Sequence, residues 1–303
     1  IFVQLALGLN AYISGQGEAK IAMLSVLIGA VLNICLDPLF IFVLHMGVRG
    51  AAVATVLSQA VSAIWVVHFL VSEKSVMRLT LKNMHLKKDV IKMIAGLGIS
   101  PFIMQSTESL VTITLNTGLQ RYGGDLYVGS MSILMSVMQM ITIPVQGITQ
   151  GIQPIISYNY GTGDAARVHA TFRLSLKTAF ISGLVAFAVM YAFCPYIVAM
   201  FLEPGCPAYG IATKGIPYFA SGFICFALNI TWIGYYQSIE LARKAMLFML
   251  LRGIILMSIC FLALPHLLGE KGLWLAVPCA ELIIFITLTV DYQYRHKVCR
   301  AVE

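Results

Sequence analysis

The sequence predicts an all-α membrane protein that crosses the bilayer several times. Of its 303 residues, 59% are hydrophobic and 11% are charged, and its mean hydropathy is +0.87. A soluble domain carries about 25% charged residues. The apolar runs are 20–28 residues long and lack period-2 alternation. Because irregular backbone cannot face lipid, such runs indicate membrane-spanning helices rather than a barrel.

Nine hydrophobic segments follow one another along the chain. They lie near 1–14, 21–45, 48–72, 93–117, 127–154, 170–194, 209–237, 245–268 and 272–291. The chain begins at Ile1 inside an apolar stretch without a basic region before it, so the first segment is expected to be incomplete rather than a signal peptide. The longest polar stretch, 73–92, contains six Lys or Arg and is expected to be a linker or an interfacial amphipathic segment.

The basic residues indicate an orientation. When 73–92 is placed in the cytoplasm and the segments alternate sides, 16 of the 20 Lys and Arg fall on the cytoplasmic side. This split obeys the positive-inside rule. We therefore expect a multi-pass protein of the cell inner (plasma) membrane, with its linker and C-terminus in the cytoplasm.

Composition and motifs argue against several classes of function. The net charge of +7 follows from the cytoplasmic loops, so no nucleic-acid partner is expected. The seven cysteines form no C-x-x-C and mostly lie in apolar runs, which is typical of reduced core residues. The six histidines form no i, i+4 pair, and there is no G-x-S-x-G motif. An enzyme, a cofactor and a transition-metal site are therefore not expected.

Two stretches of the chain recur at a nearly constant offset. "YISGQGEAKIAML" (12–24) resembles "YYQSIELARKAML" (235–247), and "GVRGAAVA" (47–54) resembles "GEKGLWLA" (269–276). Both matches keep the same order and side, which is typical of transporters built from parallel repeats. The second half begins near residue 93, so the offset predicts about 130 further residues and three helices ahead of Ile1.

We therefore expect two parallel-related lobes of six helices, or twelve helices in full length. Residues 1–72 would be the C-terminal part of the N-lobe (helices 4–6), 73–92 the cytoplasmic linker, and 93–303 the C-lobe (helices 7–12) with a short cytoplasmic tail. A chain of this extent alone is not expected to transport.

Asp37 places a carboxylate near the middle of the segment 21–45. Such a charge costs about 2.5–3.5 kcal/mol on insertion scales, so it indicates function by default. Asn33 lies four residues earlier on the same helical face, and Thr55 lies at comparable depth on the next helix. Pro38 has no N–H to donate to the carbonyl of Ile34, which adds an acceptor nearby.

This polar trio is absent from the second half of the repeat. The corresponding positions are Ile255 or Leu256, Ile259 or Cys260, and Val277. Hard oxygen ligands suit Na⁺ or a shuttled proton, so Asp37, Asn33 and Thr55 are predicted to bind the coupling ion. The alternative is a buried aspartate whose hydrogen bonds merely join two helices.

A polar stripe follows one face of the segment 93–117. It contains Gln105, Glu108, Thr112 and Asn116, and such a stripe is expected to face a water-filled substrate cavity. Gln153, in the run 146–164, is assigned to the same cavity. The alternative for the stripe is a hydrogen-bonded contact between helices.

Two further sequence features are expected to be structural. Arg252 and Glu281 lie at similar depth in their helices and are expected to neutralise each other. The "GTG" of residues 161–163 follows no strand and precedes no Lys-Ser/Thr, so it is predicted to be a helix-ending turn rather than a phosphate loop.

Three motifs together resemble the multidrug and toxic compound extrusion (MATE) family. They are "NICLDPLFIF" (33–42), "GVRGAAVATVLSQ" (47–59) and "QGIQPIISYNYG" (150–161), and the resemblance covers essentially the whole chain. It implies export of cationic or amphipathic compounds by Na⁺ or H⁺ antiport, through alternating access between two lobes. The segment "YYQSIELARK" (235–244) departs from the family pattern at Ile239 and Glu240.

The resemblance also implies roles for particular residues. The family's N-lobe cation site uses an Asn and an Asp four apart on the fifth helix and a Thr on the sixth, which match Asn33, Asp37 and Thr55. Some branches carry a functional Glu on the seventh helix, close to Glu108. The expected partners are drugs or toxins and the lipid bilayer, and the expected state is a monomer. The alternative is a related lipid-linked sugar flippase, which is expected to line its cavity with several Arg for pyrophosphate.

Overall fold

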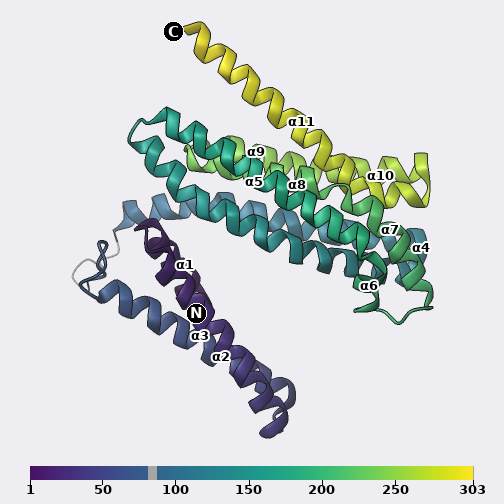
Figure 1. Cartoon of the computed structure of the whole chain (residues 1–303), viewed down its shortest axis with the longest axis horizontal. Helices are drawn as coiled ribbons and strands as arrows, with labels where there is room; N and C mark the ends of the chain where they lie inside the picture. Colours follow the sequence, from purple (N-terminus) through teal and green to yellow (C-terminus); the bar gives the residue numbers. More distant parts are fainter. Residues whose placement is uncertain (81–86, 303) are drawn as a thin grey trace. The chain divides into compact units, whose positions relative to one another are not determined.

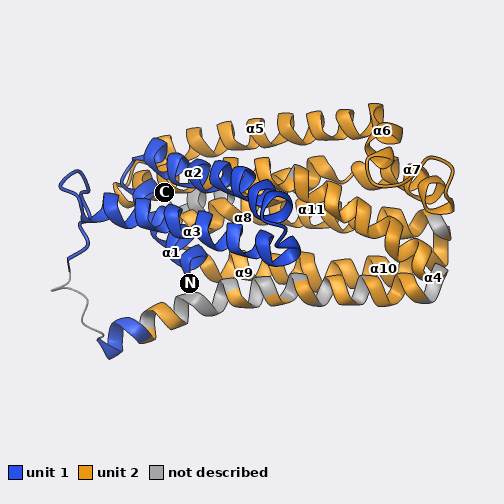
Figure 2. Cartoon of the chain, turned by 90° about the horizontal axis from the view of Figure 1, so that it is seen from below, with its two compact units in different colours: residues 1–91 blue, residues 92–303 orange. Residues whose placement is uncertain are grey.

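The protein is described by a computed structural model that covers residues 1–80 and 87–302. These residues are almost entirely helical (Figure 1). At several positions between 93 and 141, at 270 and at 294–302, the backbone alone is described. The chain divides into two compact units, residues 1–91 and residues 92–303 (Figure 2).

Within its described residues up to Leu79, the first unit contains three helices and a π-helical turn. The elements are α1 (Phe2–Gly15), α2 (Ala19–Pro38), η1 (Leu39–Val43) and α3 (Gly47–Val71). Its core joins Ile13 of α1 and Ala22 of α2 to Val66, Phe69 and Leu70 of α3.

The described part of the second unit contains eight helices and a π-helical turn. The elements are α4 (Lys88–Gly161), α5 (Ala165–Ala192), α6 (Cys194–Ala199), α7 (Pro207–Ala220), α8 (Phe223–Ser238), α9 (Ala242–Leu250), η3 (Leu251–Leu256), α10 (Met257–Leu268) and α11 (Glu270–Val302). One core cluster is centred on Trp274 of α11 and Phe219 of α7. A second joins Phe172 of α5, Trp232 of α8 and Leu288 of α11.

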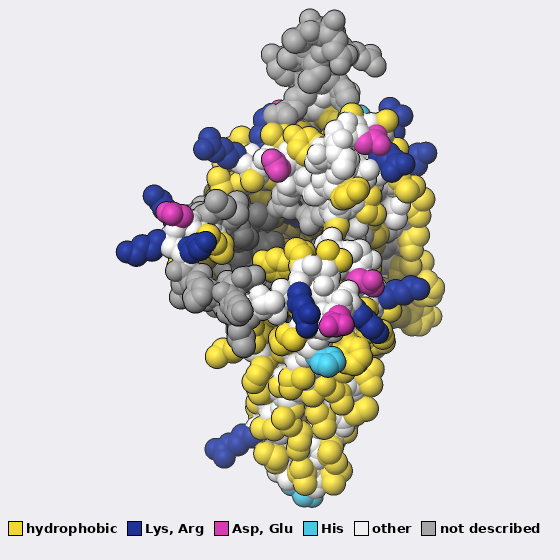
Figure 3. Space-filling model, turned by 90° about the vertical axis from the view of Figure 1, so that its left-hand side faces the viewer, with side chains coloured by type: hydrophobic (Ala, Val, Ile, Leu, Met, Phe, Trp, Pro, Cys, Tyr) yellow, Lys and Arg dark blue, Asp and Glu magenta, His cyan; other side chains and the backbone are white. Residues whose placement is uncertain are grey.

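The fold class predicted from composition is confirmed. Within the described residues, six helical stretches are long and apolar enough to cross a membrane, or up to seven if α7 and α8 form one bent span. Large hydrophobic side chains such as Ile34, Phe42 and Leu174 are exposed, and hydrophobic side chains make up much of the surface visible in Figure 3. Such a surface fits a lipid environment, since a soluble monomer rarely exposes large apolar patches.

Three predicted segments differ in detail from the structure. The run 209–237 was expected as one span, but it bends by 51° between α7 and α8. The bend falls at Gly222, where a Cβ would lie 3.0 Å from Cα of Pro278, so the missing side chain allows a close approach to α11. The segments 93–117 and 127–154 both fall in α4, which leaves helical geometry at Gly124 (φ 68°, ψ −160°).

The first part of the predicted linker packs against the first unit. The side chain of Gln16, the C-cap residue of α1, accepts hydrogen bonds at Oε1 from Ser75 Oγ (3.1 Å) and from the Val76 N–H (2.9 Å). The Leu79 N–H donates to the Leu70 carbonyl at 2.9 Å. Residues 81–86 of the predicted linker lie outside the described residues, and α4 begins at Lys88.

The repeated stretches share an uncommon backbone conformation at matching positions. Gly17 (φ 89°) and Glu240 (φ 62°) both lie in the turn that follows the first helix of each repeat. Gly47 (φ 54°) is the first residue of α3, and Gly269 (φ 59°) directly precedes α11, the helices that end each repeat. Glu240 is the only one of these four that is not glycine, and it takes a left-handed conformation that side chains rarely adopt. The departure noted in "YYQSIELARK" therefore lies in a turn, after α8 has ended at Ser238.

Candidate functional site

The three side chains predicted to bind a cation lie together in the first unit. Asp37, near the end of α2, is half-buried. Asn33 Nδ2 donates to Asp37 Oδ1 at 3.3 Å and to Thr55 Oγ1 of α3 at 3.5 Å. Thr55 Oγ1 donates its own proton to the Ala51 carbonyl at 2.9 Å. Thr55 Oγ1 therefore has one acceptor lone pair left beside the one that accepts from Asn33.

Small residues bring α2 and α3 close enough for this arrangement. A Cβ on Gly29 would overlap Ser62 Oγ, so the two helices cross here without an intervening side chain. Ser62 Oγ donates to the Ser25 carbonyl at 2.8 Å, and both serines are buried. Small-residue crossings of this kind allow close packing where lipid provides no hydrophobic driving force.

The backbone after Asp37 leaves α-helical geometry. Pro38 ends α2, and the π-helical turn η1 follows, with the Leu44 N–H donating to the Leu39 carbonyl at 2.9 Å. A Cβ on Gly50 of α3 would lie 2.8 Å from the carbonyl carbon of Phe40, so α3 packs directly on this turn. Proline and π-helical turns change helical hydrogen bonding, and π-helical turns are frequent at functional sites.

The donor set at Asp37 suits a hard cation or a proton. If the Asn33 amide turns over, its Oδ1 joins a carboxylate and a hydroxyl to give three oxygen ligands from two helices. None of the ion pairs within the described residues includes Asp37. Among the same residues, no group of three His, Cys, Asp or Glu side chains lies close enough to hold a metal ion.

The predicted substrate stripe is described only in part. The side chains of Gln105 and Glu108 lie outside the described residues, whereas those of Thr112 and Asn116 are exposed. Gln153 is half-buried, and its Nε2 donates to Gln237 Oε1 of α8 at 3.0 Å. A cavity shared by all five predicted side chains therefore stays a prediction.

A small cavity lies beside Gln153, between α4, α5 and α8. Its volume is about 10 Å³, and its walls include the hydroxyls of Thr149, Ser175, Thr231 and Ser238. Each hydroxyl donates to a backbone carbonyl four residues earlier in its own helix. A cavity of this size holds about one water molecule, so it is too small for a drug.

The predicted pairing of Arg252 with Glu281 is present. Arg252 Nε lies 2.7 Å from Glu281 Oε1, and the two side chains are 15% and 6% exposed. Asn229 of α8 donates through Nδ2 to Glu281 Oε2 at 2.8 Å and to the Glu281 carbonyl at 2.9 Å. The guanidinium also lies over the Phe226 ring, with 4.9 Å between Cζ and the ring centroid. One buried polar cluster therefore links η3, α8 and α11.

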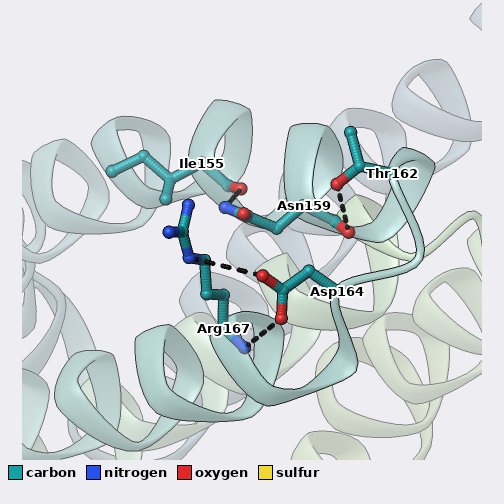
Figure 4. A network of polar contacts seen from close by, with 5 residues as sticks. All are labelled: Ile155, Asn159, Thr162, Asp164 and Arg167. Carbon is teal, nitrogen blue, oxygen red and sulfur yellow. Dashed lines mark hydrogen bonds and ion pairs between the residues drawn. The ribbon is translucent and has the colours of Figure 1, made fainter.

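The "GTG" motif forms the predicted helix-ending turn between α4 and α5 (Figure 4). Asp164 is the N-cap of α5 and accepts from the Arg167 N–H at 3.0 Å. Arg167 Nε lies 3.3 Å from Asp164 Oδ2, and Thr162 Oγ1 donates to the Asn159 carbonyl at 3.1 Å. These contacts close the turn on itself, as expected for a structural connection.

The family profile described as MatE matches residues 101–262, more than half of the chain. The chain belongs to the MatE family. Among its relatives is the Multidrug export protein MepA of Staphylococcus saprophyticus, which is 23% identical over 98% of this chain and 65% of the relative. MepA of Staphylococcus haemolyticus shows the same identity and coverage. The chain thus spans about two thirds of the length of these curated relatives.

Solved structures of MATE proteins share the fold. A crystal structure of MATE in complex with MaL6 gives a TM-score of 0.90 at 21% identity, covering 99% of this chain and 68% of that one. The outward-facing conformation of a multidrug resistance MATE family transporter gives 0.86 at 22% identity, covering 95% and 65%.

The contacts of two polar residues of this MatE chain were not predicted from the sequence. Asn229 is fully buried, and its Nδ2 bridges to Glu281 while its Oδ1 has no hydrogen-bond partner in the described structure. An asparagine inside the apolar run "ALNITW" (227–232) is a signal of such a buried contact. Gln237, the partner of Gln153, carries no comparable signal because it lies at the end of its helix.

Proposed function

We propose that the protein exports cationic or amphipathic small molecules across the plasma membrane, in exchange for Na⁺ or H⁺ bound at Asp37. Membership of the MatE family and the names of the relatives support multidrug export. The observation that carries the ion assignment is the cluster of Asp37, Asn33 and Thr55 at the end of α2 and in α3. In this proposal the protein is a monomer that uses no cofactor and carries out no enzymatic step.

The geometry offers a way for an ion to act on the helices. The Asn33 amide donates to a carboxylate on α2 and to a hydroxyl on α3. Protonation of Asp37 removes the charge of the carboxylate that accepts from Asn33. Binding of Na⁺ requires the Asn33 amide to present its oxygen in place of its nitrogen. Either ion therefore changes this pattern of hydrogen bonds. The change falls directly beside η1, where the backbone has already left α-helical geometry. Coupling requires only that ion and drug prefer different conformations.

The drug contacts are assigned to the polar stripe. We propose that Glu108 attracts cationic compounds and that Gln105, Thr112, Asn116 and Gln153 contribute polar contacts. The flippase alternative requires free arginines for a pyrophosphate. The intramembrane Arg252 is held by Glu281 and Phe226, so it does not favour that alternative.

Dye efflux from cells that express this chain within its full-length protein tests the ion assignment. Asp37→Asn is expected to reduce ion-driven efflux to the level of cells without the protein. Asp89→Asn, an exposed carboxylate in the first turn of α4, is the matched control and is expected to leave efflux unchanged. Surface expression of each variant is measured alongside. If Asp37→Asn still exports dye against a gradient, Asp37 is not the coupling site.

A further inference from the structure

Among the described residues of the second unit, the helix α5 has one buried face and one exposed face. Its buried face packs against α8 and α7, and Ala179 on this face also packs against Val145 of α4. The buried face carries Val168, Phe172, Ser175, Ala179, Gly183 and Met190. The opposite face carries exposed side chains at helical spacing, namely Ala170, Arg173, Lys177, Phe180, Ile181, Leu184 and Ala188. This second set lies along one side of the helix because its members recur at intervals of three and four residues.

Two cations lie at one end of the exposed face, and apolar side chains occupy the rest. Arg173 and Lys177 are four residues apart, so their Cβ atoms are about 5–6 Å from each other. Neither forms an ion pair with a carboxylate among the described side chains. Beyond them, Phe180, Ile181 and Leu184 are 47%, 60% and 45% exposed. The face thus changes from basic to apolar within one turn of the helix.

The position of the cations along the helix matches a membrane interface. From Arg173 to the end of α5 at Ala192 the helix rises about 29 Å, close to the thickness of a hydrocarbon core of about 30 Å. Arg173 therefore lies at one boundary of the apolar region, and Lys177 lies one turn inside it. Long basic side chains at this depth extend their charge toward the headgroups.

We propose that this face of α5 binds an anionic phospholipid. The lipid phosphate lies between Arg173 and Lys177, and its acyl chains lie along Phe180, Ile181 and Leu184. The two cations favour a negatively charged headgroup, and the continuous apolar face beyond them favours a ligand that carries long hydrocarbon chains. The proposal rests on membrane location and on α5 alone, and it does not depend on the transported compound or on Asp37.

Native mass spectrometry of the purified protein in detergent tests the site. Phosphatidylglycerol, phosphatidylcholine with the same acyl chains, and inorganic phosphate are titrated separately. A basic residue near an anionic membrane surface is worth about 1 kcal/mol, so Arg173→Gln/Lys177→Gln is expected to weaken phosphatidylglycerol binding about 30-fold. The matched control, Lys214→Gln/Lys271→Gln, removes the same charge from exposed positions on α7 and α11 and is expected to change binding by less than about threefold.

The charge-preserving variant Arg173→Lys/Lys177→Arg is expected to retain binding, and circular dichroism shows whether each variant is folded. The proposal is overturned if phosphatidylcholine binds as tightly as phosphatidylglycerol or if the two double glutamine variants lose binding equally. It is also overturned if inorganic phosphate alone occupies the site as strongly, because the apolar face would then contribute nothing.

Discussion

Replacing Arg252 by methionine is expected to destabilise the second unit strongly. The substitution keeps an unbranched side chain of similar length but removes the guanidinium that lies 2.7 Å from Glu281. Glu281 is only 4% exposed, so its carboxylate loses its counter-ion without gaining access to water. Removing one partner of a buried ion pair typically costs about 3–5 kcal/mol. Asn229 still donates to Glu281 Oε2, so we expect the lower end of this range, about 3 kcal/mol.

The double variant Arg252→Met/Glu281→Leu is expected to recover most of that loss. Replacing a buried ion pair by apolar residues of similar volume is often neutral, because no charge remains to be compensated. Asn229 loses its bond to Oε2 but keeps the bond to the backbone carbonyl of residue 281, which any residue provides. The remaining cost is therefore about one hydrogen bond, about 1 kcal/mol.

Thermal unfolding in detergent, followed by circular dichroism, measures both variants. In a domain of this size, 3 kcal/mol corresponds to a fall in Tm of about 6–12 °C. The exposed Lys214→Met is the control and is expected to leave Tm within about 2 °C of the parent. A double variant that is less stable than Arg252→Met, or an Arg252→Met protein as stable as the parent, would refute the view that the pair serves mainly to compensate charge.

Three further predictions follow from the backbone and from burial. Glu240→Gly removes the left-handed strain at φ 62° and is expected to raise stability by about 1 kcal/mol in denaturant titration; an unchanged midpoint would contradict this strain. Gly29→Ala is expected to lower stability by about 1–3 kcal/mol, because its Cβ overlaps Ser62 Oγ, and adding Ser62→Gly is expected to restore most of the loss if the overlap is the cause. Burial raises the pKa of the Cys194 thiol. A variant that keeps only this cysteine is therefore expected to react with maleimide more slowly at pH 7 than a variant that keeps only the less buried Cys206, and its rate is expected to rise with pH. Equal rates for the two variants at pH 7 would contradict this prediction.

The sequence predicted those features that depend on local composition and helical spacing. Asn33 and Asp37 share a helical face whatever their surroundings, and the basic and acidic residues at 252 and 281 had to find partners in an apolar interior. The bend at Gly222 was not predicted because it depends on contact with Pro278, which is distant in sequence.

The pairing of Gln153 with Gln237 was not predicted for the same reason, since it depends on contact between α4 and α8, which are distant in sequence. The role of Glu240 was also hidden, because glutamate is not a residue that propensity places in a left-handed turn. The stripe containing Gln105 and Glu108 stays a prediction, since these two side chains lie outside the described residues.

Each half of the chain has two matching positions with positive φ, which can serve as reference positions. The number of residues between these two reference positions differs between the halves. Gly17 and Gly47 are 30 positions apart, whereas Glu240 and Gly269 are 29 positions apart. One residue of difference rotates every later side chain of an α-helix by about 100°. The π-helical turns η1 and η3 disturb this register, and they also begin at different numbers of residues after the first reference position of each half. A carboxylate grafted into the second half by counting from Asp37 would therefore fall on Cys260 when counted from Glu240 but on Ile259 when counted from Gly269, two positions that lie about 100° apart around a helix.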